Sequence, residues 1–278
     1  MEEKKEMNIV DQALAHPIKY TFMLTKEVYS LNKRFFWGLV ALTVLLALLS
    51  EIPLLGIIAS VVSGILIFSV FLFTGKVFDR SLHMDMFVEE IEGINISKLW
   101  NNYWQIAFGA YLGWVLILLI IIFLTAFILG LSGQMDLLMS GDIAAQSPST
   151  LLSLVAVPLL LFALILYLVP LVFANTIRTD TFGDAFKSVF TLFSGSVWHR
   201  AFTGVYFKYM ALLGLVVIGL ILVLSILFSL LLALSAIDPT LMLIGTILIV
   251  IFALVFQLLT NIFYAFSSVI ADRMTQDD

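Results

Sequence analysis

The feature that most constrains this chain is a set of six long apolar stretches, each free of charged residues. A helix that crosses a membrane core of about 30 Å needs about 20 predominantly apolar residues, and each stretch meets or approaches that length. Hydrophobic residues make up 62% of the chain and charged residues only 12%, a balance outside the usual range of soluble domains. The sequence therefore predicts an all-α, polytopic membrane helix bundle with six transmembrane helices, over Phe35–Ser50, Ile52–Thr74, Trp104–Leu131, Leu151–Thr176, Tyr209–Ile237 and Leu241–Ser268.

The connection between the first two stretches is short. Glu51 would be costly in the middle of a bilayer and Pro53 suits the first turn of a helix, so "SEIP" predicts a tight turn. The first stretch is brief, and we expect it to gain a turn from residues 29–34, with Lys33 and Arg34 reaching toward the interface. One long helix through both stretches is the alternative.

In the predicted topology, all basic residues fall on one side of the membrane. The 14 Lys and Arg residues precede the first span, follow the sixth, or lie in the segments that join span two to three and span four to five. The opposite side carries only Glu51, Asp136, Asp142 and Asp238. Because basic residues are retained in the cytoplasm, both termini are predicted to be cytoplasmic.

We expect one membrane domain over residues 1–278, with an N-terminal cytoplasmic interfacial segment at 1–34, the six-span bundle at 35–268 and a cytoplasmic tail at 269–278. The N-terminus is charged and lacks a short apolar core with a cleavage site, so the first span should act as an uncleaved signal. The absence of Cys excludes disulfides, thiolate metal sites and a Cys nucleophile. With a net charge of −5 and no basic arm, the chain gives no indication of nucleic-acid binding.

The segment between spans four and five, "LVFANTIRTDTFGDAFKSVFTLFSGSVW", interrupts apolar sequence with charges. Its phenylalanines recur at helical spacing and share one face, whereas Asp184 and Lys187 fall elsewhere. Asp180 or Thr181 can cap the start of this helix, and Gly195 can end it. A short amphipathic helix in the cytoplasmic interface fits best. Its predicted apolar face comprises Phe182, Phe186, Val189, Phe190 and Phe193.

Two further interfacial elements are predicted at the same side of the membrane. The loop between spans two and three carries a similar but more acidic stripe, which includes Phe87 and Ile91. Gly93 and Asn95 are predicted to end it, and Ser97 can cap the helix that leads into span three. Residues Met7–Lys33 are expected to form another interfacial element, interrupted at Pro17.

The amphipathic helix between spans four and five has two interpretations. As a structural elbow it would turn the chain between two spans and seal the inner edge of the bundle. As a docking surface it would bind a cytoplasmic partner, such as the ATPase of a transporter, because motor subunits engage loops between spans two and three and between four and five. The candidate docking residues are Phe182, Phe186, Lys187 and Phe190.

The two long cytoplasmic connections also resemble each other. At the offset that aligns Trp100 with Trp198, Phe108 aligns with Tyr206. Spans two and four share an orientation, so this pattern predicts a parallel internal repeat with its axis along the membrane normal. Aromatic belts that recur wherever a helix meets the interface are the alternative explanation.

Pro170, followed by "FGDAFKSVFTLFSGSVW", resembles a broad bacterial superfamily of six-helix membrane domains. One branch is the membrane domain attached to glycerophosphodiester phosphodiesterases, and many other members stand alone. The resemblance covers Leu151–Leu213 best and extends more loosely to "SEIPLLG" and Gly75. It implies a helical bundle with interfacial elbows in the bacterial cytoplasmic (inner) membrane. It implies no catalytic residue, and the chain has no phosphodiesterase domain.

No constellation in the sequence points to catalysis, a metal or a cofactor. His16, His83 and His199 fall outside the predicted spans, and no ionisable Asp, Glu, Lys, Arg or His falls at the bilayer centre. This pattern disfavours a proton relay or an intramembrane hydrolase. "HMDM" at His83–Met86 offers a poor metal-ligand set, and HExxH and Walker motifs are absent. We expect no enzymatic activity, no cofactor and no resident metal.

Uncharged polar residues mark one side of the sixth span. Gln257, Asn261 and Ser268 align, with Thr260 and Tyr264 adjacent to them. Such groups in a bilayer form interhelical hydrogen bonds, each contributing about 0.6 kcal/mol, or line a pathway. Both roles stay open for this face.

Span four contains two candidate hinges, Pro158 and Pro170, because proline frees backbone carbonyls inside a helix. Two small-residue motifs predict close helix packing: "GAYLG" at Gly109–Gly113, and Ser60 with Gly64. They fit contacts within the bundle or between the copies of a homo-oligomer.

These patterns predict a non-enzymatic membrane subunit, permease-like or scaffold-like, that works with a cytoplasmic or membrane partner. The motivating observation is the presence of cytoplasmic amphipathic helices in two related loops without an energy-coupling group. The alternative is a protein that binds or redistributes membrane lipids on its own, suggested by the 24 phenylalanines and the interfacial helices. The sequence predicts no substrate.

Overall fold

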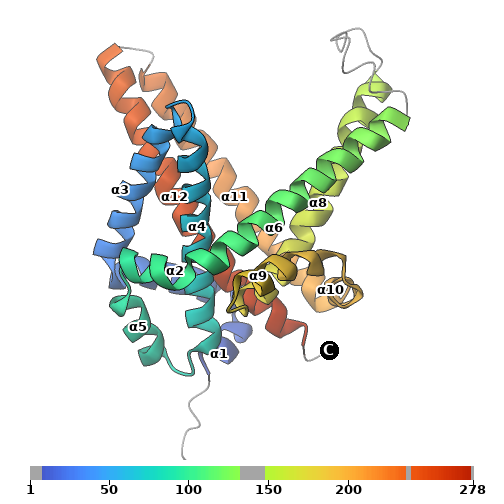
Figure 1. Ribbon diagram of the computed structural model, residues 1–278, viewed down its shortest axis with the longest axis horizontal. Helices are drawn as coiled ribbons and strands as arrows, with labels where there is room; N and C mark the ends of the chain where they lie inside the picture. The colour runs from blue at the N-terminus through green and yellow to red at the C-terminus, as the bar shows by residue number, and fades with distance from the viewer. Residues whose placement is uncertain (1–7, 132–147, 236–238, 277–278) are drawn as a thin grey trace, which may run out of the picture.

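The computed structural model describes residues 8–131, 148–235 and 239–276, which form helices joined by short turns (Figure 1). Six of the described helices are long and apolar enough to cross a membrane. They confirm the all-α membrane bundle and the six spans predicted from the apolar stretches. In chain order these helices are α3 (Lys33–Ser50), α4 (Leu55–Arg80), α6 (Ile96–Leu131), α8 (Pro148–Ile177), α11 (Gly204–Ser235) and α12 (Pro239–Met274).

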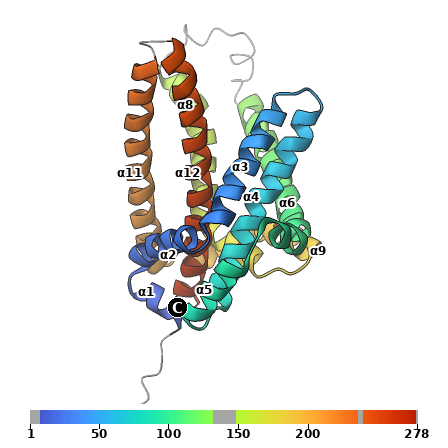
Figure 2. The same ribbon diagram turned by 90° about the vertical axis from the view of Figure 1, so that its left-hand side faces the viewer.

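The spans lie close together at one end and separate toward the other. In Figure 1, α6 and α8 lean to one side while α3, α4, α11 and α12 lean to the other. Figure 2, turned by 90°, shows α11 and α12 on one side and α3 and α4 on the other. We name the close-packed end, which carries Lys76, Arg178 and Arg200, the charged end.

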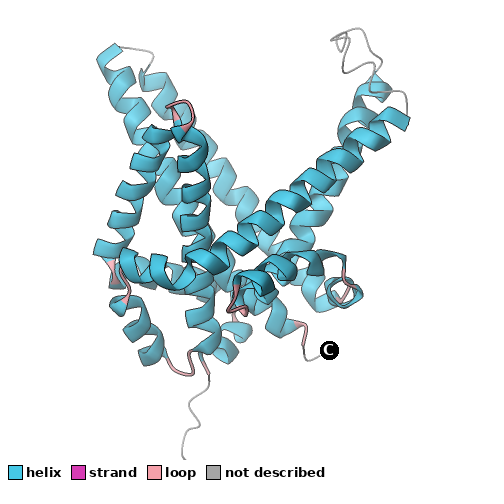
Figure 3. Ribbon diagram, viewed as in Figure 1, coloured by secondary structure: helices cyan, strands magenta, loops and turns pink. Residues whose placement is uncertain are grey.

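The shorter helices gather at the charged end, and no strand occurs among the described residues (Figure 3). The predicted break in the N-terminal element is confirmed, because Pro17 occupies the first turn of a second helix, where its missing N–H costs nothing. In chain order the shorter elements are α1 (Ile9–Ala15), α2 (Pro17–Leu31), α5 (Met84–Gly93), α9 (Phe182–Val189), the 3₁₀ helix η2 (Phe190–Phe193) and α10 (Gly195–Ala201).

The tight turn between α3 and α4 is confirmed. Leu54 adopts a φ of 69°, a left-handed conformation that is uncommon for a residue with a Cβ. The amide of Gly56 donates to the carbonyl of Ile52 (2.7 Å), and a Cβ on Gly56 would lie 2.3 Å from the carbonyl oxygen of Ser50. Only glycine permits this approach. The alternative of one long helix through both stretches is wrong.

The centre of the bundle is built on α4 and α12, which pack against each other. α4 also contacts α3 and α6, while α12 contacts α2, α8 and α11. Aromatic rings pack between these helices: the ring centroids of Phe78 on α4 and Phe266 on α12 lie 5.2 Å apart, and those of Phe71 on α4 and Phe173 on α8 lie 4.7 Å apart. Burial of such rings is the largest apolar contribution that a side chain can make to a core.

Several element boundaries differ from those predicted. The helix expected to run to Gly195 ends at Val189, and Gly195 instead begins α10. Asn95 rather than Ser97 caps α6, since its side chain accepts the amide of Lys98 (2.9 Å). The helix α12 continues past the expected end of the bundle at 268. Outside the described residues lie 1–7 and 277–278, with the predicted opposite-side carboxylates Asp136, Asp142 and Asp238.

Candidate functional site

An apolar cavity of about 590 Å³ lies between α2, α3, α11 and α12. Its volume is typical of small-molecule sites. Figure 2 shows α2 lying across the lower ends of the spans, with α11 and α12 on one side and α3 on the other. The walls are mostly aromatic and aliphatic, with Trp37 from α3, Leu220 from α11 and Phe256 from α12. Among the described residues that line the cavity, Lys26 alone carries a charge.

Two aromatic contacts hold α2 across the spans. The ring of Phe22 lies 5.0 Å from that of Phe263 on α12, and the ring of Tyr29 meets Phe36 on α3 edge-to-face at 5.0 Å. Phe22 and Tyr29 are seven residues apart and therefore share a face of α2. All four rings line the cavity. The contacts that position α2 therefore also form the cavity walls.

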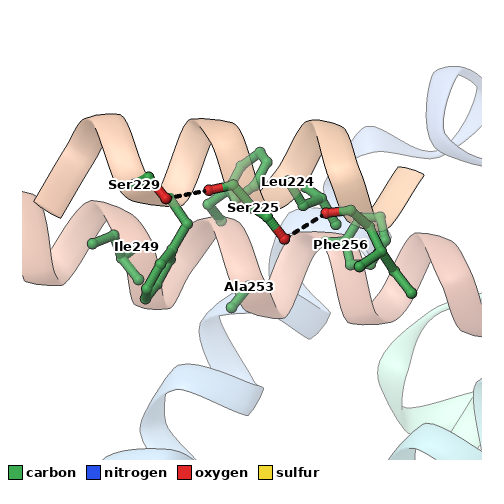
Figure 4. Close-up of a pocket in the computed structure, with 9 residues that line it drawn as sticks. Leu224, Ser225, Ser229, Ile249, Ala253 and Phe256 are labelled. Carbon is green, nitrogen blue, oxygen red and sulfur yellow. Dashed lines mark hydrogen bonds between the residues drawn. The ribbon is translucent and has the colours of Figure 1, made fainter. Parts of the chain in front are cut away.

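A second cavity of about 390 Å³ continues along α11 and α12 (Figure 4). Ile221 and Phe256 line both cavities, so the two are adjacent. The hydroxyl of Ser225 donates to the carbonyl of Ile221 (2.8 Å), and that of Ser229 donates to the carbonyl of Ser225 (2.8 Å). Both serine hydroxyl groups therefore donate their hydrogen to the backbone of α11 rather than to an occupant of the cavity. The walls therefore suit an apolar chain better than a polar solute.

The five polar residues predicted on span six do not share one environment, and Ser268 donates within its own helix, to the carbonyl of Tyr264 (2.7 Å). Thr260 and Tyr264 line the first cavity. Asn261 instead donates to the carbonyl of Ile67 on α4 (2.8 Å), which is an interhelical hydrogen bond. Gln257 is exposed and lines neither cavity. Of this predicted polar face, Thr260 and Tyr264 therefore belong to a cavity wall, while Asn261 belongs to a contact between helices.

The two glycines of the "GAYLG" motif in α6 pack against α9. A Cβ on Gly109 would lie 2.3 Å from the carbonyl oxygen of Phe182, and a Cβ on Gly113 would lie 2.9 Å from Cγ2 of Val189. Glycine at both positions therefore lets the backbone of α9 approach α6 closely. The motif could have served contacts within the bundle or contacts between copies of the chain, and the structure shows a contact within the chain.

Three of the four candidate docking residues belong to α9, and the fourth, Phe190, begins η2. Phe182 is 41% exposed and Lys187 is exposed, whereas Phe186 and Phe190 are partly buried with ring centroids 5.3 Å apart. Of the predicted apolar face, Val189 is buried against α6, because the close approach of the two helices leaves room only for smaller side chains than phenylalanine. The buried residues of α9 are Ala185, Ser188 and Val189.

A network of ion pairs joins α4, α10, α12 and the end of α8 at the charged end. Asp272 is fully buried and pairs with Arg178 (2.6 Å) and Arg200. Asp79 pairs with Arg178 (3.1 Å) and Arg273 (2.8 Å). Burial alone would lower the pKa of Arg178, but the hydrogen bond that Arg178 donates to Asp79 and the charges of both carboxylates outweigh it and raise that pKa. Buried carboxylates persist in such places because cations compensate them.

A second group of charges fixes the segment that follows α8. Lys76 of α4 is almost fully buried, pairs with Asp180 (2.7 Å) and donates to the carbonyl of Thr179. Arg80 also reaches Asp180 (3.1 Å). The hydrogen bond from Lys76, with the charges of Lys76 and Arg80, holds the pKa of Asp180 below its usual value of 3.8. The charges that interrupt the apolar sequence there thus make structural contacts.

Both candidate hinge prolines lie inside α8, which continues through them. Pro170 is buried in the half of α8 nearest the charged end, while Pro158 is partly exposed in the other half. Their action as hinges stays a prediction.

The sequence pattern does not single out Lys26, Asp79 or Asp272. The seven-residue spacing of Phe22 and Tyr29 could have marked the face of α2 that also carries Lys26. The ionic partners of Asp79 and Asp272 are distant in sequence, so no local spacing indicates those pairs.

Comparison with known proteins returned no match: no family model, no curated protein and no solved structure is significantly similar to this chain. The resemblance of Pro170 and the segment after it to a bacterial membrane superfamily therefore stays a prediction. Within the part of the chain that the structure describes, no group of three or more His, Asp or Glu side chains is arranged to hold a metal ion. The account of function rests on the geometry of the cavities and their surroundings.

Proposed function

We propose that this chain is a non-enzymatic, six-span membrane protein that binds a membrane lipid in the cavity between α2, α3, α11 and α12. The observation that carries the proposal is the pair of adjacent apolar cavities along α11 and α12, about 590 and 390 Å³ in volume. Their walls belong to helices long and apolar enough to span a membrane. An occupant that enters from the side would therefore come from the hydrocarbon of the bilayer.

The length of the cavities supports an acyl chain as the occupant. The lining residues of α11 extend from Val217 to Ser229. Over these residues the helix axis rises about 18 Å at about 1.5 Å per residue. One leaflet of a hydrocarbon core about 30 Å thick measures about 15 Å. A single extended acyl chain matches this length.

The proposal puts the charged end in the cytoplasm, with both termini there, and the protein in the bacterial inner membrane. The described Lys and Arg residues all lie on elements of the charged end, which supports this orientation through the positive-inside rule. The bacterial origin of the membrane rests on the resemblance noted for Pro170 and the segment that follows it.

Native mass spectrometry of protein released gently from its own membrane tests the proposal. We expect a tightly retained lipid that Leu220→Trp, which fills the cavity, displaces. Leu215→Trp makes the same change on α11 at a side chain that is 67% exposed and lines neither cavity, and it should retain the lipid. Equal lipid retention by the two variants, or none by the unaltered protein, would contradict the proposal.

A second function, as a subunit that docks a cytoplasmic partner such as an ATPase or another membrane subunit, is favoured by the outer side of α9. Phe182 and Lys187 are exposed there, and Phe193 of η2 is 58% exposed. Under this function a second chain would co-purify in a fixed ratio, and Phe182→Asp with Lys187→Glu would release it. A preparation that never contains such a chain would exclude this function.

A further inference from the structure

We infer that the lipid in this cavity is anionic, with the phosphate of its headgroup paired to the ammonium of Lys26. The inference rests on the proposed function and adds the class of lipid. It follows from the charge, position and surroundings of Lys26, which is exposed and lines the cavity.

Lys26 is an exposed cation without a counter-ion in the described structure. It lines the cavity, and no described residue forms an ion pair or hydrogen bond with its side chain. The adjacent carboxylate, Glu27, accepts a hydrogen bond from the hydroxyl of Ser30 on the same helix (3.2 Å). By contrast, Lys76 at the same end is bound by Asp180 (2.7 Å). An ammonium at the mouth of an apolar cavity complements an anionic group on an otherwise apolar ligand.

The position of Lys26 along the membrane normal suits a headgroup. α2 lies across the lower ends of α11 and α12 at the charged end (Figure 2). The two cavities are lined by residues of these same spans. Tyr29 and Trp37 line the same part of the cavity, and Trp37 is 47% exposed. Tyr and Trp concentrate at the level of lipid headgroups. A lipid whose phosphate meets Lys26 would therefore direct an acyl chain along α11 toward the bilayer centre.

The charge, rather than the apolar wall, would select the lipid. An acyl chain that moves from the bilayer into the cavity leaves one hydrocarbon environment for another, so apolar burial supplies little preference. A lysine near an anionic lipid surface contributes a preference of about fivefold. Lys26 is the one charged residue on the cavity wall within the part of the chain that the structure describes, so it would provide this preference.

Lipid competition measured by native mass spectrometry tests the inference. The purified full-length chain is equilibrated with mixed micelles of equimolar phosphatidylcholine and phosphatidylglycerol, and the bound lipid is identified. We expect phosphatidylglycerol to be preferred, and Lys26→Gln to reduce that preference about fivefold while a lipid remains bound. Lys208→Gln is the matched control: it removes the same charge from α11, nine residues before Val217 and on the opposite face of the helix.

The outcomes separate this inference from the proposed function. An unchanged preference for phosphatidylglycerol in Lys26→Gln, or an equal loss in Lys208→Gln, overturns the pairing with Lys26. If a lipid is retained without headgroup preference and Leu220→Trp displaces it, the inference fails while the proposed function stands. If the unaltered protein retains no lipid, the proposed function itself fails. Lys26 is exposed, so circular dichroism should show Lys26→Gln to be folded.

Discussion

The two ends of this bundle are held by different interactions. At the charged end, Asp79 and Asp272 pair with arginines from three segments, and short helices close the ends of the spans. Toward the other end the spans diverge (Figure 1). Side chains such as Ile122 and Phe123 of α6 are more than 60% exposed. In a bilayer, apolar helices gain little by leaving lipid for one another. Hydrophobicity therefore defines the spans, while ion pairs, hydrogen bonds and small residues decide where they meet.

Loss of Asp272 should disturb the charged end most. Asp272→Ala leaves Arg178 and Arg200 without their buried carboxylate, and breaking a buried ion pair costs about 3–5 kcal/mol. We expect a large fall in the midpoint of thermal unfolding in detergent. Glu89→Ala removes an exposed carboxylate of α5 and should change the free energy of unfolding by less than about 0.5 kcal/mol. Equal stability of the two variants would show that the network does not hold this end.

A methyl group on Gly109 should separate α9 from α6. The Cβ of Gly109→Ala would lie 2.3 Å from the backbone oxygen of Phe182, so we expect a loss of about 1–3 kcal/mol from overpacking. Gly130→Ala alters the same helix toward the diverging end, where no atom of the described residues lies within 4 Å of the added Cβ, and should be neutral or stabilising. Hydrogen exchange of α9 measures the separation. Unchanged protection of α9 in Gly109→Ala would contradict this packing.

The hydrogen bond between α12 and α4 should make a smaller contribution. Asn261→Leu removes the donor to the carbonyl of Ile67, which should cost about 0.6 kcal/mol. Gln257→Leu, one turn earlier on α12, removes an exposed amide and should have no destabilising effect. Unfolding in detergent compares the two variants. An equal loss in both would mean that Asn261 is no more important to the helix contact than Gln257.

Asp180→Asn should give the smallest effect, and one that depends on pH. The folded-state pKa of Asp180 is lowered, so the contribution of its ion pairs is present at neutral pH. It is lost as the pH falls from 3.8 through the lowered pKa. Solvent weakens the effect because the side chain is 69% exposed. Unfolding at several pH values should show a small difference from the unaltered protein that vanishes in acid, and a difference that grows in acid would contradict the assignment.

The spans could be predicted from the sequence because each depends on local composition. The turn at Glu51 and Pro53 and the break at Pro17 were predictable for the same reason, since backbone constraints act within a few residues. The cap at Thr181 was one of two local alternatives, and its hydroxyl accepts the amide of Asp184 (3.1 Å). The internal repeat depends on a relationship between two halves of the chain and stays a prediction.

The candidate site could not be predicted because it depends on which distant helices meet. The cavity brings Tyr29 of α2 together with Leu220 of α11 and Phe256 of α12, and no spacing within one helix indicates those neighbours. The spacing of Gly109 and Gly113 predicted a close helix contact, but it did not indicate that the partner is α9. Thr260 and Asn261 are adjacent in sequence, yet one lines the cavity and the other bonds α4.

Photochemical cross-linking by a lipid tests the central claim, lipid binding along α11 and α12, most directly. The protein would be reconstituted with a phospholipid that carries a diazirine in its acyl chain, irradiated and digested, and the modified residues mapped by mass spectrometry. The account predicts modification concentrated on the cavity walls, at residues such as Ser225 and Phe256, well above that at Ile122 and Phe123 of α6. Modification spread equally over the exposed faces of α6 and α11 would mean that bulk lipid alone surrounds the protein, and would contradict the account.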